Sequence, residues 1–110
     1  MFDANSERTG KTYRFIGPTK LYITINKDLA GNIREVFLNA ASSGSTIRSL
    51  CEALGKAVSI ALQNEKRLLP RIIRSFQDDL SESQWHCSEL SRPAKSIPDA
   101  LSLVLAQGQG

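Results

Sequence analysis

The sequence predicts an α+β fold, with a short antiparallel β-meander packed on one long helix that is followed by two shorter helices. Three observations support this prediction. Apolar and polar residues alternate up to Ala40, as in half-buried strands. Beyond Gly44, apolar residues recur at spacings of three and four, as on one face of a helix. Two later segments carry proline and capping residues typical of helix starts. The 110 residues suffice for one domain with one core.

Three segments show the strand pattern. The first, 11–16, alternates aromatic with polar residues, and the second, 21–26, has the cleanest alternation in the chain. Gly17-Pro18 between them is a turn signal. Residues 27–32 contain aspartate and glycine and suit a hairpin loop that leads into a third strand, 33–40. These strands predict an antiparallel meander with one buried face.

One long helix is expected next. It should begin at an N-cap formed by Ser45 or Thr46 and run to about Asn64. Its apolar positions are Ile47, Leu50, Cys51, Leu54, Val58, Ala61 and Leu62. Gly55 within this helix costs roughly 1 kcal/mol against alanine. That cost suggests that another backbone, either of the sheet or of a second subunit, comes close to Gly55.

Two shorter helices complete the predicted domain. The first begins near Leu69 with a proline in its first turn. Its expected apolar face consists of Leu69, Ile72, Ile73, Phe76 and Leu80. Residues 78–95 are polar and irregular, and so long a loop in a small domain is often functional or mobile. The last helix should start at the N-cap Ser96, with Asp99 completing a capping box. It should dock on the core through Leu101, Val104 and Leu105.

The charge balance narrows the class of partner. With 14 Lys+Arg against 11 Asp+Glu, the net charge is +3. This excess permits an anionic small molecule or an acidic protein, but it falls short of the dense basic stripe of a nucleic-acid binder. No apolar run approaches the roughly 18 residues of a membrane span, and the chain start lacks the apolar core of a secretory signal. We therefore expect a cytoplasmic protein without membrane contact.

The cysteines predict neither a disulfide framework nor a catalytic centre. There are 2 cysteines. Cys51 lies in an apolar helical pattern and is expected in the core, whereas Cys87 lies in the polar loop and is expected to be exposed. A reactive pair with His86 would need the base held against the thiol, which adjacency in sequence does not supply. No acid/base pair is recognisable either, so we expect no catalytic residues and no enzyme activity.

The turn before the long helix is the first candidate binding site. Backbone N–H groups at a helix N-terminus, with the positive end of the helix dipole behind them, bind anions. Arg48 in the same segment could serve as a charged partner. The residues that precede and open the helix are Ser43, Gly44, Ser45 and Thr46. The alternative is a tight turn with a simple N-cap, because no Walker-type Gly-Lys-Ser/Thr motif is present.

Two further candidates lie later in the chain. Arg67, Arg71 and Arg74 are spaced four and three apart, so they share one side of a helix. Such a face suits a nucleotide or an acidic protein, although a solvated surface is the alternative interpretation. Trp85 in the long loop is a candidate anchor for a protein partner or a cover for a ligand. Its alternative role is to cap the small core from outside.

Five segments, taken in their order and spacing, resemble the TSCPD domain: 9–15, 20–26, 35–39, 52–62 and 96–100. This family occurs near the C-terminus of adenosylcobalamin-dependent ribonucleotide reductases and as small free-standing proteins. The resemblance implies a single TSCPD-like domain over 11–106, with a flexible segment 1–10 and a frayed end 107–110. The large catalytic barrel of the reductases is not part of these residues, so this chain alone is not expected to reduce ribonucleotides.

The family typically carries four cysteines that are associated with a metal or iron–sulfur centre. The resemblance places these positions near Gly17-Pro18, on Thr46, near Cys87 and on Ile97, so at most one of the four thiols is retained. A structural zinc site or an iron–sulfur cluster needs several such ligands. We therefore expect no metal and no cofactor.

Three functional hypotheses follow, of which the third is a metal site shared across subunits through Cys87 and His86. The first is a non-enzymatic binding module for a small anionic, nucleotide-like ligand. Free-standing members of the family also occur in phages, where such a module could sequester a nucleotide signal. The second hypothesis is a protein-interaction or regulatory module, for a ribonucleotide reductase or another enzyme, derived from a metal-binding ancestor. The glycine in the long helix also favours a homodimer, in which two turns would approach one shared pocket.

Overall fold

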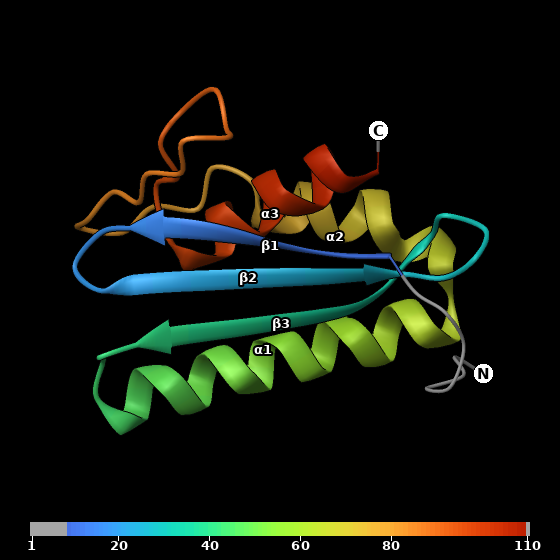
Figure 1. Ribbon diagram of the computed structural model, residues 1–110, viewed down its shortest axis with the longest axis horizontal. Coiled ribbons are helices and arrows are strands. Elements are labelled where there is room, and N and C mark those ends of the chain that lie inside the picture. Colours follow the sequence, from blue (N-terminus) through green and yellow to red (C-terminus); the bar gives the residue numbers. More distant parts are fainter. Residues whose placement is uncertain (1–8, 110) are drawn as a thin grey trace.

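The computed structural model describes residues 9–109, which form a three-stranded sheet, three α-helices and a short 3-10 helix (Figure 1). The strands β1 (Thr9–Ile16), β2 (Lys20–Lys27) and β3 (Ile33–Ala41) are neighbours in space in the same order as in the sequence. They are followed by α1 (Ser45–Asn64), η1 (Lys66–Leu68), α2 (Leu69–Phe76) and α3 (Ile97–Gly108). The predicted α+β architecture is therefore confirmed.

The meander has the buried face that the alternation predicts. β1 pairs antiparallel with β2, which places Phe15 opposite Leu21, and β2 pairs antiparallel with β3, which places Ile23 opposite Leu38. These four side chains are buried on one face of the sheet, together with Tyr13, Ile25, Val36 and Ala40. The intervening residues point to the other face, as expected for an antiparallel sheet with one covered side.

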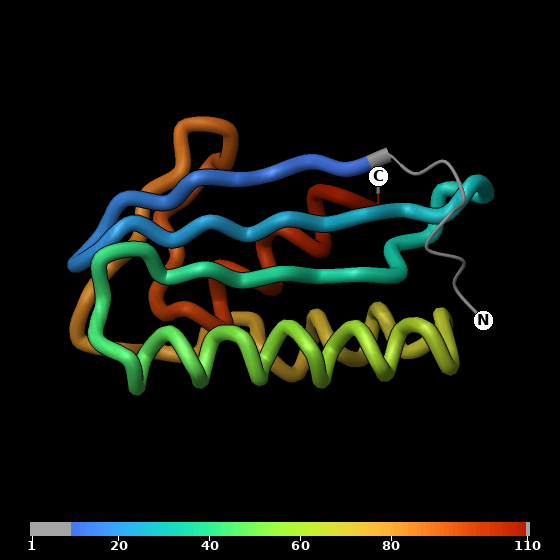
Figure 2. The backbone as a smooth tube through the Cα atoms, turned by 60° about the horizontal axis from the view of Figure 1, so that its bottom comes forward, coloured from blue at the N-terminus to red at the C-terminus, as the bar shows by residue number. Residues whose placement is uncertain are grey.

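α1 lies along the free edge of β3 (Figures 1 and 2). Gly55 comes so close to this edge that an added Cβ would lie 3.0 Å from the carbonyl oxygen of Val36. One turn later, Ser59 Oγ accepts a hydrogen bond from the Val36 N–H at 2.8 Å and donates one to the Val36 carbonyl at 3.0 Å. The sheet thus makes the close approach predicted at Gly55. The helix also satisfies edge groups that would otherwise be open to another strand.

The two shorter helices, α2 and α3, lie behind the sheet in the view of Figure 1. Leu101, Val104 and Leu105 of α3 are fully buried, as predicted. Ser96 is the N-cap of α3, and its Oγ accepts a hydrogen bond from the Asp99 N–H at 3.0 Å. None of the helices formed by residues 9–109 has the length and apolar character that a membrane crossing requires.

The start of α1 differs from the prediction. Gly44 is the N-cap, in an extended conformation, and no side chain caps the helix. Ser45 and Thr46 were the predicted caps, but both already belong to the first turn. The chain turns early because Ser42 adopts a left-handed φ of 65° and Ser43 Oγ donates a hydrogen bond to the Ala40 carbonyl at 2.6 Å.

The prediction that Cys87 is exposed was wrong. The long loop between α2 and α3 is held to the sheet by backbone hydrogen bonds. Ile16 and His86 exchange two of them, at 2.8 and 2.9 Å, and Trp85 and Ala94 exchange two more within the loop, at 2.9 and 2.7 Å. These bridges direct Trp85 and Cys87 into the core, where their exposed fractions are 5% and 9%.

The ends of two helices also differ from expectation. Leu80 was expected on the apolar face of α2, but the helix ends before it and the side chain is 76% exposed. α3 continues to Gly108, which is packed so closely on Ile25 that a Cβ there would clash with the isoleucine side chain. A flexible segment was expected over residues 1–10. Residues 1–8 lie outside the described residues, and residues 9 and 10 belong to β1.

Candidate functional site

A cavity of about 570 Å³ opens where four segments meet, at the left-hand end of the molecule in Figure 1. These segments are the β1–β2 turn, the β3–α1 turn, the long loop and the start of α3. The lining residues are Pro18, Thr19, Ser42, Ser43, Gly44, Ile47, Asp79, Ser81, Glu82, Ser83, Trp85, Ser96, Ile97 and Pro98. The volume lies within the range of roughly 300–1,000 Å³ that is usual for small-molecule sites.

The N-terminus of α1 forms one wall of this cavity. Gly44 and Ile47 line it, and the first backbone hydrogen bond of the helix runs from the Arg48 N–H to the Gly44 carbonyl at 3.2 Å. The N–H groups before Arg48 precede the helical hydrogen-bond ladder, no side chain caps them, and no acidic residue lies in the first turn. This end of the helix therefore presents donors and a positive partial charge to the cavity.

An apolar wall stands beside these donors. It is built from Trp85, Ile47, Ile97 and two prolines. Gly17 in the β1–β2 turn packs against the indole, because an added Cβ would lie 2.6 Å from the ring. The absence of a side chain at Gly17 thus allows the β1–β2 turn to contact the indole ring of Trp85 directly. An aromatic and aliphatic wall beside polar groups is the usual composition of a small-molecule site.

Carboxylates lie on the loop side of the cavity. Asp79 and Glu82 both line it, with Ser81 and Ser83 between and beyond them. Carboxylates accept hydrogen bonds from hydroxyl and amino groups, whereas the end of α1 donates hydrogen bonds to acceptors. The cavity therefore suits a ligand that has an anionic group at one end and hydroxyl or amino donors elsewhere.

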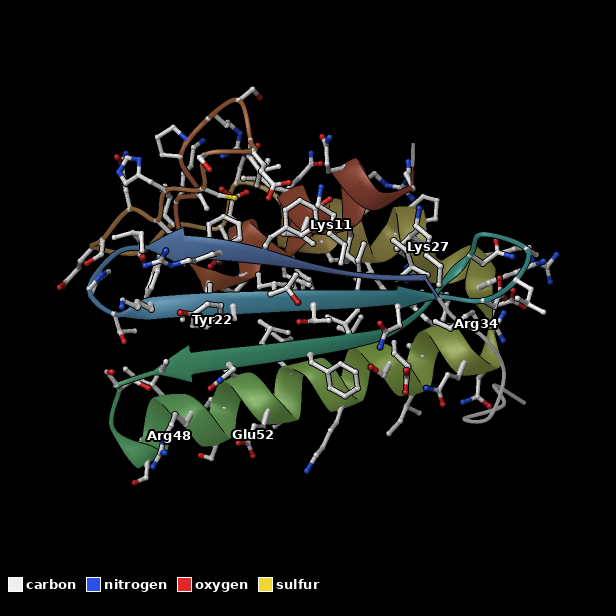
Figure 3. The ribbon with its side chains drawn as sticks, in the orientation of Figure 1. Lys11, Tyr22, Lys27, Arg34, Arg48 and Glu52 are labelled. Atoms are coloured by element: carbon white, nitrogen blue, oxygen red, sulfur yellow. The ribbon has the colours of Figure 1, made fainter. Side chains whose placement is uncertain are left out.

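The cavity brings together only part of the predicted site. Ser43 and Gly44 line it, and Ser45 and Thr46 follow in the first turn of α1. Arg48 is on the same turn, but its side chain is exposed and does not line the cavity (Figure 3). The helix end, rather than this guanidinium, is therefore the positive element of the cavity wall.

The predicted arginine face lies elsewhere. Arg67 is in η1, beyond the far end of α1, and Arg71 and Arg74 follow in α2. The 20 residues of α1 separate its two ends by about 30 Å. Arg67 is instead paired with Glu65, at 2.9 Å between Nε and Oε1, and this hydrogen bond lowers the pKa of Glu65 to about 2. None of the three arginines lines the cavity at the β3–α1 turn.

Sequence reasoning missed the β1–β2 turn and the carboxylates of the loop as parts of the site. Thr19 and Asp79 come from segments that are far apart in the sequence, and no motif connects them. The glycine–proline turn is a signal that could have pointed to Thr19, because Gly17 allows this turn to approach Trp85 closely.

Together, the fold and the cavity define a small α+β domain. Its antiparallel β-meander is bordered by a long helix along β3, and a cavity lies at one end of the sheet. The family model of the TSCPD domain matches residues 3–109. The chain therefore belongs to the TSCPD domain family. No curated protein and no solved structure matches this chain.

Two of the four positions at which the resemblance to the family predicts a cysteine, near Gly17-Pro18 and on Ile97, include residues that line the cavity. Thr46 lies between the lining residues Gly44 and Ile47, and Cys87 is two residues from the lining Trp85. Among residues 9–109, no three His, Cys, Asp or Glu side chains gather as a metal site would require. The proline, threonine and isoleucine at these positions offer no thiolate, so the donor set does not fit a zinc or iron–sulfur centre.

Proposed function

We propose that this protein is a non-enzymatic binding module that holds a small, anionic, nucleotide-like ligand in the cavity at the β3–α1 turn. The observation that supports this function is the opening of the uncapped N-terminus of α1 into a cavity of about 570 Å³. A phosphate would accept hydrogen bonds from the first-turn N–H groups. The cavity is also large enough for the rest of a nucleotide beside that phosphate.

The other walls support a nucleotide rather than a bare anion. Asp79 and Glu82 are suited to accept hydrogen bonds from ribose hydroxyls or from the amino group of a base. The apolar wall at Trp85 is suited to contact a base. The family association with ribonucleotide reductases also favours this class of ligand. A phage protein that sequesters a nucleotide signal only has to bind the nucleotide and does not have to convert it.

A thermal-shift screen of nucleoside phosphates, cyclic nucleotides and inorganic phosphate would test the proposal. A ligand at a hundredfold excess over its Kd stabilises the folded state by about 2.7 kcal/mol, which is readily measured as a rise in Tm. We expect at least one nucleotide to give such a rise and to quench or shift the fluorescence of Trp85, the single tryptophan of the chain.

Gly44→Asp is the most informative variant for this screen. Its new carboxylate would cap α1 and occupy the place of the anion, and no atom lies within 4 Å of the added Cβ. Gly44→Ala is the matched control, because its methyl group has open space around it and neither caps the helix nor adds a charge. We expect the aspartate variant to lose the nucleotide response and the alanine variant to keep most of it. The proposal fails if no phosphate ligand stabilises the wild-type protein, or if both variants respond alike.

A further inference from the structure

One side of α1 is exposed and carries no charge. Its centre consists of Leu50, Ala53, Ala57 and Ile60, spaced three, four and three apart, so these residues share one face of the helix. All four are exposed, and the two large side chains are exposed to 64% and 62%. We refer to these four residues as the uncharged face. In Figure 2, no described segment passes in front of α1 on the side turned toward the viewer.

The ionisable residues of α1 are confined to the neighbouring side of the helix. They are Arg48, Glu52 and Lys56, which follow one another at intervals of four and form a single row. The four residues of the uncharged face are all aliphatic, and the charged residues of the helix lie beside them rather than among them. Core positions of interfaces between proteins are depleted of charge in the same way.

We infer that the uncharged face is a homodimer interface, in which α1 packs antiparallel against α1 of a second copy. The reason for choosing a second copy is the symmetry of the face about position 55. Leu50 and Ile60 each lie five residues from this position, and Ala53 and Ala57 each lie two residues from it. A two-fold axis at the helix midpoint therefore sets Leu50 of one copy beside Ile60 of the other, as a self-complementary interface requires.

The small residues at the centre allow the two helices to approach closely. Ala53 and Ala57 lie next to the axis, where a large side chain would hold the helix backbones apart. Leu50 and Ile60, at the ends of the uncharged face, then pack against α1 of the other copy. This arrangement buries the apolar groups that the single chain leaves in water.

The bordering charges also complement one another across the axis. Glu52 and Lys56 are one turn apart on the same border of the uncharged face. In an antiparallel pair, residues on the same border of the two helices meet, so Glu52 of one copy lies near Lys56 of the other. Within residues 9–109, neither side chain forms an ion pair. Both are thus available to a partner.

This geometry separates the two cavities of the dimer. Each cavity lies at the N-terminal end of its own α1, and antiparallel helices place these ends about 30 Å apart. The dimer therefore has one independent cavity per chain, not a pocket shared between two turns. A variant that is monomeric should still bind a ligand that the cavity binds.

Sedimentation equilibrium over a dilution series from millimolar to micromolar protein tests the interface. We expect a mass that rises toward twice the 12.1 kDa of the chain. Leu50→Glu should shift the protein to the monomer mass, with at least about a tenfold rise in dissociation constant, because a charge would be buried at the interface. Leu29→Glu is the matched control, because Leu29 is 80% exposed in the β2–β3 turn, outside the uncharged face.

Charge reversal gives a second, independent readout. Glu52→Lys alone and Lys56→Glu alone should each weaken the dimer, and the two together should restore it, since the double change re-forms both intermolecular pairs. Circular dichroism would verify that each variant is folded. The inference is overturned by a wild-type protein that is monomeric at millimolar concentration. Equal masses for the Leu50 and Leu29 variants, or a double reversal as weak as the single ones, would also overturn it.

Discussion

Arg92 holds the carboxylate of Asp99 through two parallel hydrogen bonds, from Nη1 to Oδ2 at 2.8 Å and from Nη2 to Oδ1 at 3.0 Å. Asp99 lies in the first turn of α3 and is fully buried. Its carboxylate also accepts hydrogen bonds from the backbone N–H groups of Asp78 and Lys95, both at 2.8 Å. One carboxylate therefore joins both ends of the long loop to α3 and fixes the wall of the cavity that the loop provides.

Removal of this carboxylate should destabilise the domain. Asp99→Ala leaves Arg92 and two backbone donors without this acceptor, and we expect a loss of about 1–3 kcal/mol, because the backbone N–H groups lose their hydrogen-bond partner while Arg92 stays partly exposed to solvent. Urea denaturation at neutral pH measures the change in the free energy of unfolding. Asp79→Ala is the control, because Asp79 is exposed and its loss should change stability by less than about 0.5 kcal/mol. Equal stability of the two variants would contradict the role given to Asp99.

The same carboxylate should make stability depend on pH. Burial opposes the charge of Asp99, but the hydrogen bonds from Arg92 and from the two backbone N–H groups outweigh it, so its pKa lies well below the usual range. The unfolded chain then binds the proton more readily, with a pKa of about 3.9. The stabilisation is complete above this pH and is lost as the pH falls toward the lower folded-state value.

Denaturation of the wild type and of Asp99→Asn over an acidic pH series tests this dependence. We expect the free energy of unfolding of the wild type to fall more steeply below about pH 4 than that of the variant. The pKa values of Glu65 and Asp28 are lowered as well, but they affect both proteins alike. Parallel pH profiles would show that Asp99 does not contribute.

Ser59 should matter more than its small size suggests. Its hydroxyl is the partner of both the N–H and the carbonyl of Val36 on the free edge of β3. Ser59→Ala leaves both groups facing α1 without a partner, which we expect to cost about 1–3 kcal/mol. Ser49→Ala, on an exposed part of the same helix, removes only a bond to the Thr46 carbonyl and serves as the control. Thermal unfolding would separate the two variants.

Gly17→Ala should displace Trp85. The new methyl group would lie 2.6 Å from the indole of Trp85 and 2.9 Å from the backbone carbonyl oxygen of Gln84. The turn or the ring must therefore move. We expect a red-shifted tryptophan emission spectrum and a loss of about 1–3 kcal/mol from overpacking. Gly44→Ala adds the same methyl group where nothing lies within 4 Å. An unchanged emission maximum in the Gly17 variant would refute the close contact.

The carboxylates of the loop should distinguish a nucleotide from a bare anion. If Asp79 and Glu82 accept hydrogen bonds from the nucleoside, the double change Asp79→Asn and Glu82→Gln should weaken nucleotide binding about tenfold. Binding of inorganic phosphate should stay the same or improve, because negative charge is removed. Isothermal titration calorimetry measures both affinities. An equal loss for both ligands would place the carboxylates outside the nucleoside contact.

Most of the fold could be predicted from the sequence, because its elements are defined by local patterns. Alternation placed Leu21, Ile23 and Ile25 on one buried face. The spacing of apolar residues located the end of α1 at Asn64, where the structure has it. The N-cap Ser96 was recognisable because the cap and its first-turn partner are three residues apart.

The candidate site was predictable only in part. Ser43 and Gly44 were singled out because they immediately precede a periodic helix, and both line the cavity. Thr19 and Asp79 were not, because they reach the cavity through segments that no local pattern connects. Trp85 was recognised as notable, but whether it would lie in the core or on the surface depended on how the loop folds back.

By itself, the sequence determined the order and type of the elements, the buried face of the meander and the resemblance to a family that nearly the whole chain matches. Only the tertiary structure decided the burial of Cys87 and the backbone against which Gly55 packs. It also decided the role of Asp99, and it separated Arg67 from the β3–α1 turn. Local patterns report whether a residue prefers a helix, a strand or a turn. Contacts between distant segments depend on the backbone hydrogen bonds and close packing that form when the whole chain folds.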